Sequence, residues 1–250
     1  MYQPRSYRGG MNRERFRFFR VVHHESDLLI GVTPSCFRHE MKELALEELV
    51  RLRLILLEQD LKDPRFFSSL DPLEYSGPEA IPEEITHMLA CGKQAGTGPM
   101  AAVAGLFAER VGTRLLESFH IPELVVENGG DLFLKNEAEL NSVIHAGDAA
   151  LSDKMAFVMP PGTWGICTSS GTLGHSFSLG KADAVTVISD SAPLADAWAT
   201  ALANQVQGPG DIEPLLERIE GVAGIDGCAV IAGDRIGARG MFQLKLLSSD

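Results

Sequence analysis

The stretch ADAVTVISDSAPLADAWATAL, residues 182–202, decides the fold. Its first part, residues 184–189, is rich in β-branched side chains and predicts a strand. Either Ser191 or Asp190 can cap the helix that follows, and Pro193 suits the first turn of that helix. The sequence therefore predicts a strand that passes through a short cap into an alanine-rich helix.

Three polar residues recur along this helix, which we expect to run to about residue 207. Asp196, Thr200 and Asn204 occupy every fourth position and so form a stripe on one helical face. Short oxygen-bearing side chains suit a hard cation such as Mg²⁺, and the helix lacks the Lys and Glu residues that usually mark a solvated face. Exposure to water also explains the stripe, and the helix dipole alone favours a carboxylate near the helix start. Both interpretations stay open.

The upstream segment VVENGGDLFL, residues 125–134, reads as a hairpin, because Asn-Gly between two β-rich runs is the strongest short hairpin signal. Two consecutive glycines also let the backbone approach a phosphate or a flat ring, where Asp131 can bond a ribose or a ring nitrogen. The pattern is not GxGxxG and no helix follows at once. A Rossmann dinucleotide site is therefore not supported.

Between these two segments lies GICTSSGTLGHSFS, residues 165–178, a loop dense in glycine and hydroxyl side chains. Such a loop can present N–H and hydroxyl donors to anionic oxygens, or it can simply turn a corner. The GxSxG elbow of a serine hydrolase is absent. His175 is the histidine nearest to these motifs, and a lone loop histidine is either an acid–base group or plain surface.

The rest of the chain alternates hairpins with single helices, which predicts an α+β fold with an antiparallel sheet. We expect one domain over residues 1–250, with residues 1–12 as a flexible basic tail. The other expected elements are a first hairpin around residues 24–27, helices at 39–62, 82–91, 98–119 and 212–220, strands near 154–159 and 163–167, and a final hairpin from residue 227.

The composition excludes several functional classes. A formal net charge of −12 over 250 residues argues against a nucleic-acid groove, which needs clustered Lys and Arg. No apolar run approaches the roughly 20 residues that span a bilayer, and no secretory signal is apparent, so we expect a cytoplasmic protein. The four cysteines are scattered without a CxxC pair, which argues against a zinc site.

Taken in order, three motifs resemble the ApbE family, the FAD:protein FMN transferases. ELVVENGGDLFL, CTSSG and the stretch 182–202 match the family's Gly-Gly-Asp turn, its Thr-Ser-Gly loop and its closing strand with an ADAxAT helix. The resemblance covers most of residues 98–207. It implies an ApbE-like, T-fold-like α+β architecture in which antiparallel sheets pack with helices, and it suggests a divergent cytoplasmic branch.

The resemblance also implies ligands and an activity. It implies Mg²⁺ held by Asp196, Thr200 and a backbone carbonyl, for which Ala108 is the candidate, and FAD as substrate or ligand. The residues that would contact the flavin nucleotide and its phosphates are Asn128, Gly129, Gly130, Asp131, Thr168, Ser169, Ser170 and Gly171. The implied chemistry is cleavage of the FAD pyrophosphate, with FMN passing to a threonine of an acceptor protein or, with water, being released beside AMP.

Three departures from the family pattern keep other functions open. GHSFSLGKAD stands where the family has a longer segment with His-x-x-Asp-Pro, so His175 takes the place of the family's acid–base histidine without its Asp-Pro partner. AGLFAER lacks the family's lysine at the helix start, and the exported lipoprotein start is absent. The alternatives are a non-catalytic FAD or FMN binder and a different small-anion enzyme on the same fold. Neither the acceptor protein nor a homo-oligomer follows from the sequence.

Overall fold

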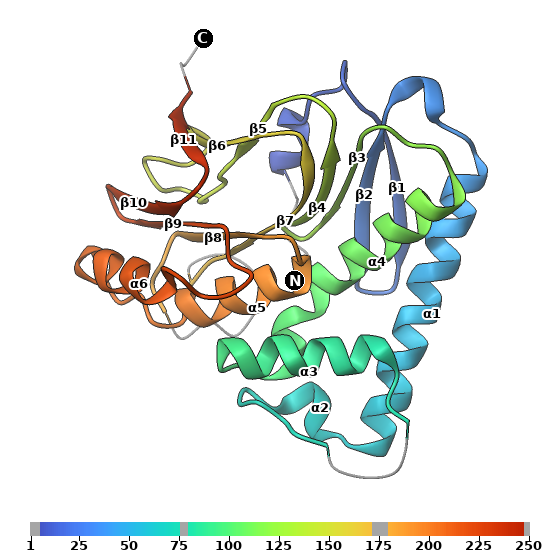
Figure 1. The fold of residues 1–250 in the computed structure, drawn as a ribbon, viewed down its shortest axis with the longest axis horizontal. Coiled ribbons are helices and arrows are strands. Elements are labelled where there is room, and N and C mark those ends of the chain that lie inside the picture. The colour runs from blue at the N-terminus through green and yellow to red at the C-terminus, as the bar shows by residue number, and fades with distance from the viewer. Residues whose placement is uncertain (1–5, 76–79, 172–179, 248–250) are drawn as a thin grey trace.

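An eight-stranded antiparallel sheet forms the centre of the protein (Figure 1). The structure, a computed structural model, describes residues 6–75, 80–171 and 180–247. Every strand of the main sheet pairs antiparallel with its neighbours. In spatial order the strands are β1 (Arg17–His23), β2 (Ser26–Val32), β3 (Leu124–Asn128), β4 (Asp131–Asn136), β7 (Gly162–Ser169), β8 (Ala184–Ser189), β9 (Gly227–Ala232) and β10 (Arg235–Gly240).

Helices cover one face of this sheet and a second, three-stranded sheet covers the other. In Figure 1 α5 and α6 lie below β8 and β9, while the small sheet lies above them. The small sheet has the order β11 (Gln243–Leu246), β6 (Met155–Met159) and β5 (Leu140–Val143). The helices are α1 (Glu40–Lys62), α2 (Arg65–Ser68), α3 (Glu83–Ala95), α4 (Val103–Ser118), α5 (Ala192–Ala203) and α6 (Ile212–Ile219).

Coverage on both faces explains why β3, β8 and β9 are buried along their whole length. All six residues of β8 are buried: Val185 and Val187 pack toward the helices, and Ala184 and Ile188 toward the small sheet. A strand buried on both faces loses the polar alternation of a half-exposed strand. The predicted α+β fold of antiparallel sheets packed with helices is confirmed.

Several boundaries differ from the expected ones for local reasons. The expected helix at 98–119 is split into a 3₁₀ turn, η3 (Pro99–Ala102), and α4. The last strand, β11, does not extend the final hairpin, because it pairs with β6 in the small sheet. The sequence also gave no signal for β5, which has four residues.

Part of the segment expected to be a flexible tail, residues 1–12, contacts the main sheet through Arg8. Residues Ser6–Gly10 form a 3₁₀ turn, η1, and the side chain of Arg8 is only 12% exposed. This arginine forms ion pairs with Asp27 and Glu127 of the main sheet. The described part of the segment is therefore docked on the sheet.

Candidate active site

Two buried carboxylates, Asp131 at the start of β4 and Asp196 in the second turn of α5, form the centre of the candidate site. Burial raises the pKa of Asp131, and the charge of Asp196 raises it further. Burial also raises the pKa of Asp196, although the backbone N–H groups of Gly105 and Ala104 act in the opposite direction. The fold therefore brings together two acids, 65 residues apart in sequence, that repel each other.

Small residues allow three elements to meet at this point. A Cβ on Gly105 in α4 would lie 2.3 Å from the carbonyl oxygen of Ala192, and a Cβ on Gly165 in β7 would lie 2.3 Å from the Cα of Ala192. Real Cβ atoms do not approach other heavy atoms so closely. The start of α5 therefore packs closely against both α4 and β7. Asp196 Oδ2 accepts a 2.9 Å hydrogen bond from Gly105 N.

A carboxylate from α4 stabilises the first turn of α5. Ser191 is the N-cap by position, as expected, but its side chain makes no cap bond and contacts His87 Nε2 at 3.3 Å. The N–H of Ala192 instead donates to Glu109 Oε2 at 2.7 Å. Burial raises the pKa of Glu109, while this N–H and Arg110 lower it. The cap that positions the Asp196 helix thus comes from a different helix.

The Gly-Gly-Asp turn between β3 and β4 adopts the conformation that its glycines permit. Gly129 and Gly130 have φ angles of 73° and 107°, which other residues rarely adopt. Asn128 Nδ2 donates to the carbonyl of Ala104 at 3.2 Å, so the turn is tied to the first turn of α4. The backbone N–H of Thr168 points to Asp131 Oδ1 at 3.3 Å.

The Thr-Ser-Gly segment was expected to be a loop, but Thr168 and Ser169 are the last residues of strand β7 and pair with β8. The hydroxyls of Thr168 and Thr186 are 2.9 Å apart, and Ser169 is half-buried. The Ser170 hydroxyl and the Gly171 N–H both donate to the carbonyl of Ala182, which fixes the end of the segment to β8. In this structure both donors are therefore used in hydrogen bonds within the protein.

The two residues that flank the segment 172–179, Gly171 and Gly180, lie near the end of α5. A Cβ on Gly171 would lie 2.2 Å from the carbonyl oxygen of Gly180, and a Cβ on Gly180 would meet the carbonyl oxygen of Ala203. Residues 171 and 180 therefore lie side by side at that end of the helix. His175, the predicted acid–base residue, lies outside the described residues.

Thr200 and Ala108 occupy different positions relative to Asp196. Thr200 follows Asp196 by one turn on the same face of α5 and is half-buried. Ala108 is fully buried one turn beyond the residues of α4 that touch Asp196, which are Ala104 and Gly105. The backbone nearest the carboxylate is thus that of the first turn of α4.

Cys167 is buried close enough to both acids to be affected by their charges. Its thiol lies 3.3 Å from the carbonyl oxygen of Ala192 and also interacts with Asp131. Burial and the charges of Asp131 and Asp196 raise the pKa of this thiol well above its usual range. Because a thiolate is the reactive form of cysteine, this neutral thiol is suited to packing and hydrogen bonding rather than to nucleophilic attack.

The donor set fits a hard divalent cation. In the described structure the hydrogen-bond partners of Asp131 and Asp196 are backbone N–H groups and the Cys167 thiol, none of which carries a positive charge. Two uncompensated buried carboxylates are unfavourable, and carboxylate, hydroxyl and carbonyl oxygens are the ligands that Mg²⁺ prefers. Over the described ranges no three His, Cys, Asp or Glu side chains group into a metal centre. A cation here would therefore also need oxygens of other kinds, such as Thr200 Oγ1.

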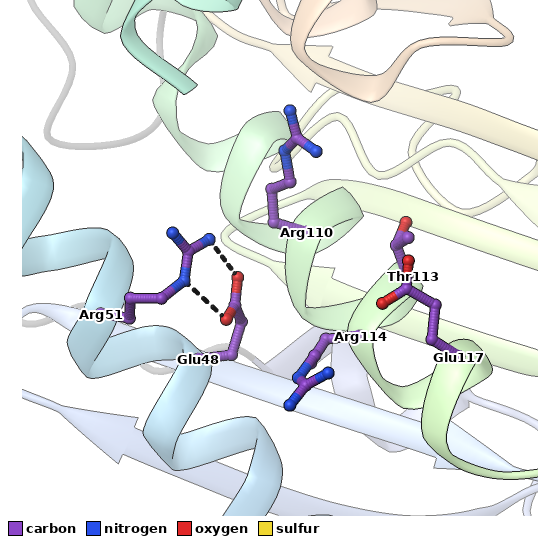
Figure 2. Close-up of a pocket in the computed structure, with 6 residues that line it drawn as sticks. All are labelled: Glu48, Arg51, Arg110, Thr113, Arg114 and Glu117. Atoms are coloured by element: carbon purple, nitrogen blue, oxygen red, sulfur yellow. Dashed lines mark hydrogen bonds and ion pairs between the residues drawn. The ribbon is translucent and has the colours of Figure 1, made fainter. Parts of the chain in front are cut away.

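A separate pocket of about 310 Å³ lies between α1 and α4 (Figure 2). Its lining is strongly charged and consists of Glu48, Arg51, Arg110, Thr113, Arg114 and Glu117. Arg51 binds both oxygens of Glu48 and also reaches Glu84, so much of this charge is paired internally. These residues lie on a different face of α4 from Gly105, and the pocket is not part of the Asp131–Asp196 site.

Comparison with known proteins places this geometry in a family. A family model described as AbpE bacteria matches residues 8–219, which include every described element of the site. The chain belongs to this family. It is a divergent member of the ApbE-like group, because the matching curated relatives are UPF0280 proteins.

Two of these relatives come from Methanococcus maripaludis and Methanocaldococcus jannaschii. A UPF0280 protein of Methanococcus maripaludis is 38% identical over 90% of this chain and 91% of its own length. Another, from Methanocaldococcus jannaschii, is 33% identical over 92% of this chain and 93% of its own length. The similarity therefore extends over nearly the whole of both chains.

Solved structures of ApbE proteins share the fold at low sequence identity. The flavinyl transferase ApbE of Pseudomonas stutzeri in its apo form matches with a TM-score of 0.57 and 14% identity, over 90% of this chain and 94% of that chain. An ApbE protein of Thermotoga maritima matches with a TM-score of 0.53 and 13% identity, over 89% and 96% of the two chains. The expected ApbE-like fold is confirmed.

Sequence reasoning did not identify several residues that build this site. No motif identified Cys167 or Glu109 as a site residue, because nothing local in the sequence links either of them to Asp196. The first turn of α4 lies in the small-residue stretch AAVAG, 101–105. The role of this stretch in contacting Asp196 emerges only from the packing of α4 against α5.

Proposed function

We propose that this protein is a Mg²⁺-dependent flavin-nucleotide enzyme that cleaves the pyrophosphate of FAD and transfers or releases FMN. The observation that carries the proposal is the pair Asp131 and Asp196, two repelling buried acids at the junction of the Gly-Gly-Asp turn and the Thr-Ser-Gly segment. The Pseudomonas stutzeri and Vibrio cholerae structures with this fold are named flavinyl or flavin transferases, which supports the assignment.

The residues present give each part of the site a role. Asp196 and Thr200, with a backbone carbonyl near the start of α4, would hold Mg²⁺, and the Gly129–Gly130 turn would let the flavin nucleotide approach the backbone closely. Thr168 and Ser169 would donate hydrogen bonds to phosphate oxygens. A bound Mg²⁺ supplies charge neutralisation at the pyrophosphate.

The proposed step is in-line phosphoryl transfer. The hydroxyl oxygen of an acceptor threonine, or of water, bonds to the phosphorus of the FMN half of FAD. The bond from that phosphorus to the bridging oxygen breaks, and AMP leaves with the bridging oxygen. The hydroxyl proton passes to a base, for which His175 is the candidate. The products are a phosphoester-linked flavin on the acceptor, or free FMN when water attacks.

This proposal is tested by incubating the purified protein with FAD, with and without Mg²⁺, and separating the nucleotides by chromatography. We expect AMP and FMN in equal amounts when water is the acceptor. When the chain flavinylates itself, we expect AMP together with covalently bound, fluorescent flavin on the chain. FAD binding without any cleavage would favour the non-catalytic binder that the shortened 171–180 segment keeps open. If the protein neither binds nor cleaves FAD, the flavin assignment is wrong. A cytoplasmic location and a threonine acceptor on another protein are further predictions. In the described ranges no helix has the length and apolar character to cross a membrane.

A further inference from the structure

An ion-pair network joins the start of the chain to the turn of the candidate flavin site. Arg8 of η1 donates from Nε to Glu127 Oε2 at 2.5 Å, from Nη1 to Asp27 Oδ1 at 3.1 Å and from Nη2 to the carbonyl of Asp27 at 2.7 Å. The side chains of Glu127 and Asp27 are 1% and 4% exposed. Arg8 therefore holds two buried carboxylates in adjacent strands.

The second oxygen of Glu127 reaches the Gly-Gly-Asp turn. Glu127 Oε1 accepts a 3.0 Å hydrogen bond from the backbone N–H of Gly130. Gly130 has a φ of 107° and precedes Asp131 directly. One carboxylate thus connects Arg8, 119 residues away in sequence, with the residue that sets the backbone direction into Asp131.

Arg8 restricts the orientation of Glu127, because its Nε and Nη2 both lie 2.5 Å from one carboxylate oxygen, Oε2. A carboxylate held at one oxygen by a guanidinium presents its other oxygen in a defined direction, which a freely rotating side chain does not. The acceptor for the Gly130 N–H is then pre-positioned before any ligand binds. Pre-organisation of this kind lowers the cost of binding a ligand at the turn.

We infer that Arg8 is a positioning residue of the flavin site, which acts through Glu127 on the Gly129–Gly130 turn. This inference rests on the proposed function for its flavin consequence, but its structural consequence at Gly130 does not depend on flavin. The N-terminal segment therefore supplies a residue that positions the turn of the site.

The chain offers a matched control in Arg15. Arg15 lies seven residues after Arg8 and binds Glu123, which immediately precedes strand β3, through Nε at 2.9 Å and Nη2 at 2.5 Å. Its side chain is 21% exposed. It also donates to the carbonyls of Ala138 and Glu139, at the end of β3 remote from the turn. Loss of Arg15 removes a similar ion pair without touching Glu127.

The test compares Arg8→Met, Arg8→Lys and Arg15→Met with the natural protein by amide hydrogen exchange of the ligand-free chain. The double variant Arg8→Met with Glu127→Gln also removes the charge of Glu127, in case Arg8→Met alone does not fold. We expect peptides containing residues 128–132 to exchange about tenfold faster in Arg8→Met and in the double variant, from the loss of about one hydrogen bond's free energy, and Arg8→Lys to restore part of the protection. Arg15→Met should leave these peptides unchanged.

Flavin affinity provides the second readout, measured by quenching of FAD fluorescence in the same variants. We expect the FAD dissociation constant to rise about tenfold in Arg8→Met and to stay within about twofold in Arg15→Met. Unchanged exchange at 128–132 in a folded Arg8 variant, or equal effects of Arg8→Met and Arg15→Met, overturns the inference. If the natural protein binds no FAD, the proposed function fails, and the exchange result still decides whether Arg8 positions the turn.

Discussion

The backbone N–H of Gly105 donates a 2.9 Å hydrogen bond to the carboxylate of Asp196, and this contact joins the start of α4 to the second turn of α5. It forms only because Gly105 has no side chain, since a Cβ there would overlap the carbonyl of Ala192. The position of the candidate metal-binding carboxylate therefore depends on a close backbone approach between two helices.

Replacing Gly105 with Ala should destabilise the protein and misplace Asp196. The added methyl group must push α5 away from α4, and such overpacking costs about 1–3 kcal/mol of unfolding free energy. Urea unfolding followed by circular dichroism measures this loss. Gly210→Ala is the control, because a Cβ at Gly210 meets nothing within 4 Å. Equal stability of the two variants would show that α4 and α5 do not pack as described.

Mg²⁺ should stabilise the natural protein against heat but not the Asp196→Asn variant. A cation that binds only the folded state adds about 2.7 kcal/mol of stability at a concentration 100 times its dissociation constant. A thermal melt with and without Mg²⁺ measures the shift. Asp148→Asn removes an exposed acid outside the site and should keep the full shift. A shift that survives Asp196→Asn would place the cation elsewhere.

Glu109→Ala should weaken the start of α5. The variant removes the acceptor of the Ala192 N–H, a contact of 2.7 Å, and loss of a helix cap costs about 0.5–2 kcal/mol. Chemical unfolding of Glu109→Ala beside Glu117→Ala, an exposed acid two turns further along α4, separates the cap from a general charge effect. Similar midpoints for both variants would argue against the cap.

Stability should fall in mild acid through His87. Burial, and then the charge of Arg110, lowers the pKa of this imidazole below its ordinary 6.5, while Glu83 opposes them. Between the folded and unfolded pKa values the unfolded chain binds more protons, so this contribution is complete above pH 6.5 and is lost as the pH falls through the folded pKa. His87→Gln should flatten the dependence of unfolding free energy on pH as the pH falls below 6.5, whereas the exposed His120→Gln should not. An unchanged slope in His87→Gln would exclude His87 as its source.

The fold could be predicted furthest where local signals agreed. For residues 184–189 the predicted strand has the same bounds as β8, because a β-branched run is followed directly by a cap and a proline. The Asn128–Gly129 signal likewise gave the β3–β4 turn. The helix predicted to reach about residue 207 ends at Ala203, where Gly180 packs against the carbonyl of that residue.

The contacts that complete the site depend on long-range packing and leave no local trace. Arg8 and Glu127 are 119 residues apart, and Glu109 and Ala192 are 83 apart, so no periodic pattern links either pair. The basic start of the chain looked like a tail because its arginines have their acidic partners in distant strands. Asp131 and Asp196 were both identified from the sequence, but their mutual burial required the structure.

The central claim is that the acids at Asp131 and Asp196 support Mg²⁺-dependent cleavage of FAD. The most direct measurement is the rate of AMP release from FAD by the natural protein, Asp196→Asn and Asp148→Asn, each with Mg²⁺ and with a chelator. We predict Mg²⁺-dependent AMP release by the natural protein and by Asp148→Asn, and none by a folded Asp196→Asn. AMP release that is equally fast in Asp196→Asn, or no AMP release by the natural protein with Mg²⁺, would contradict the account.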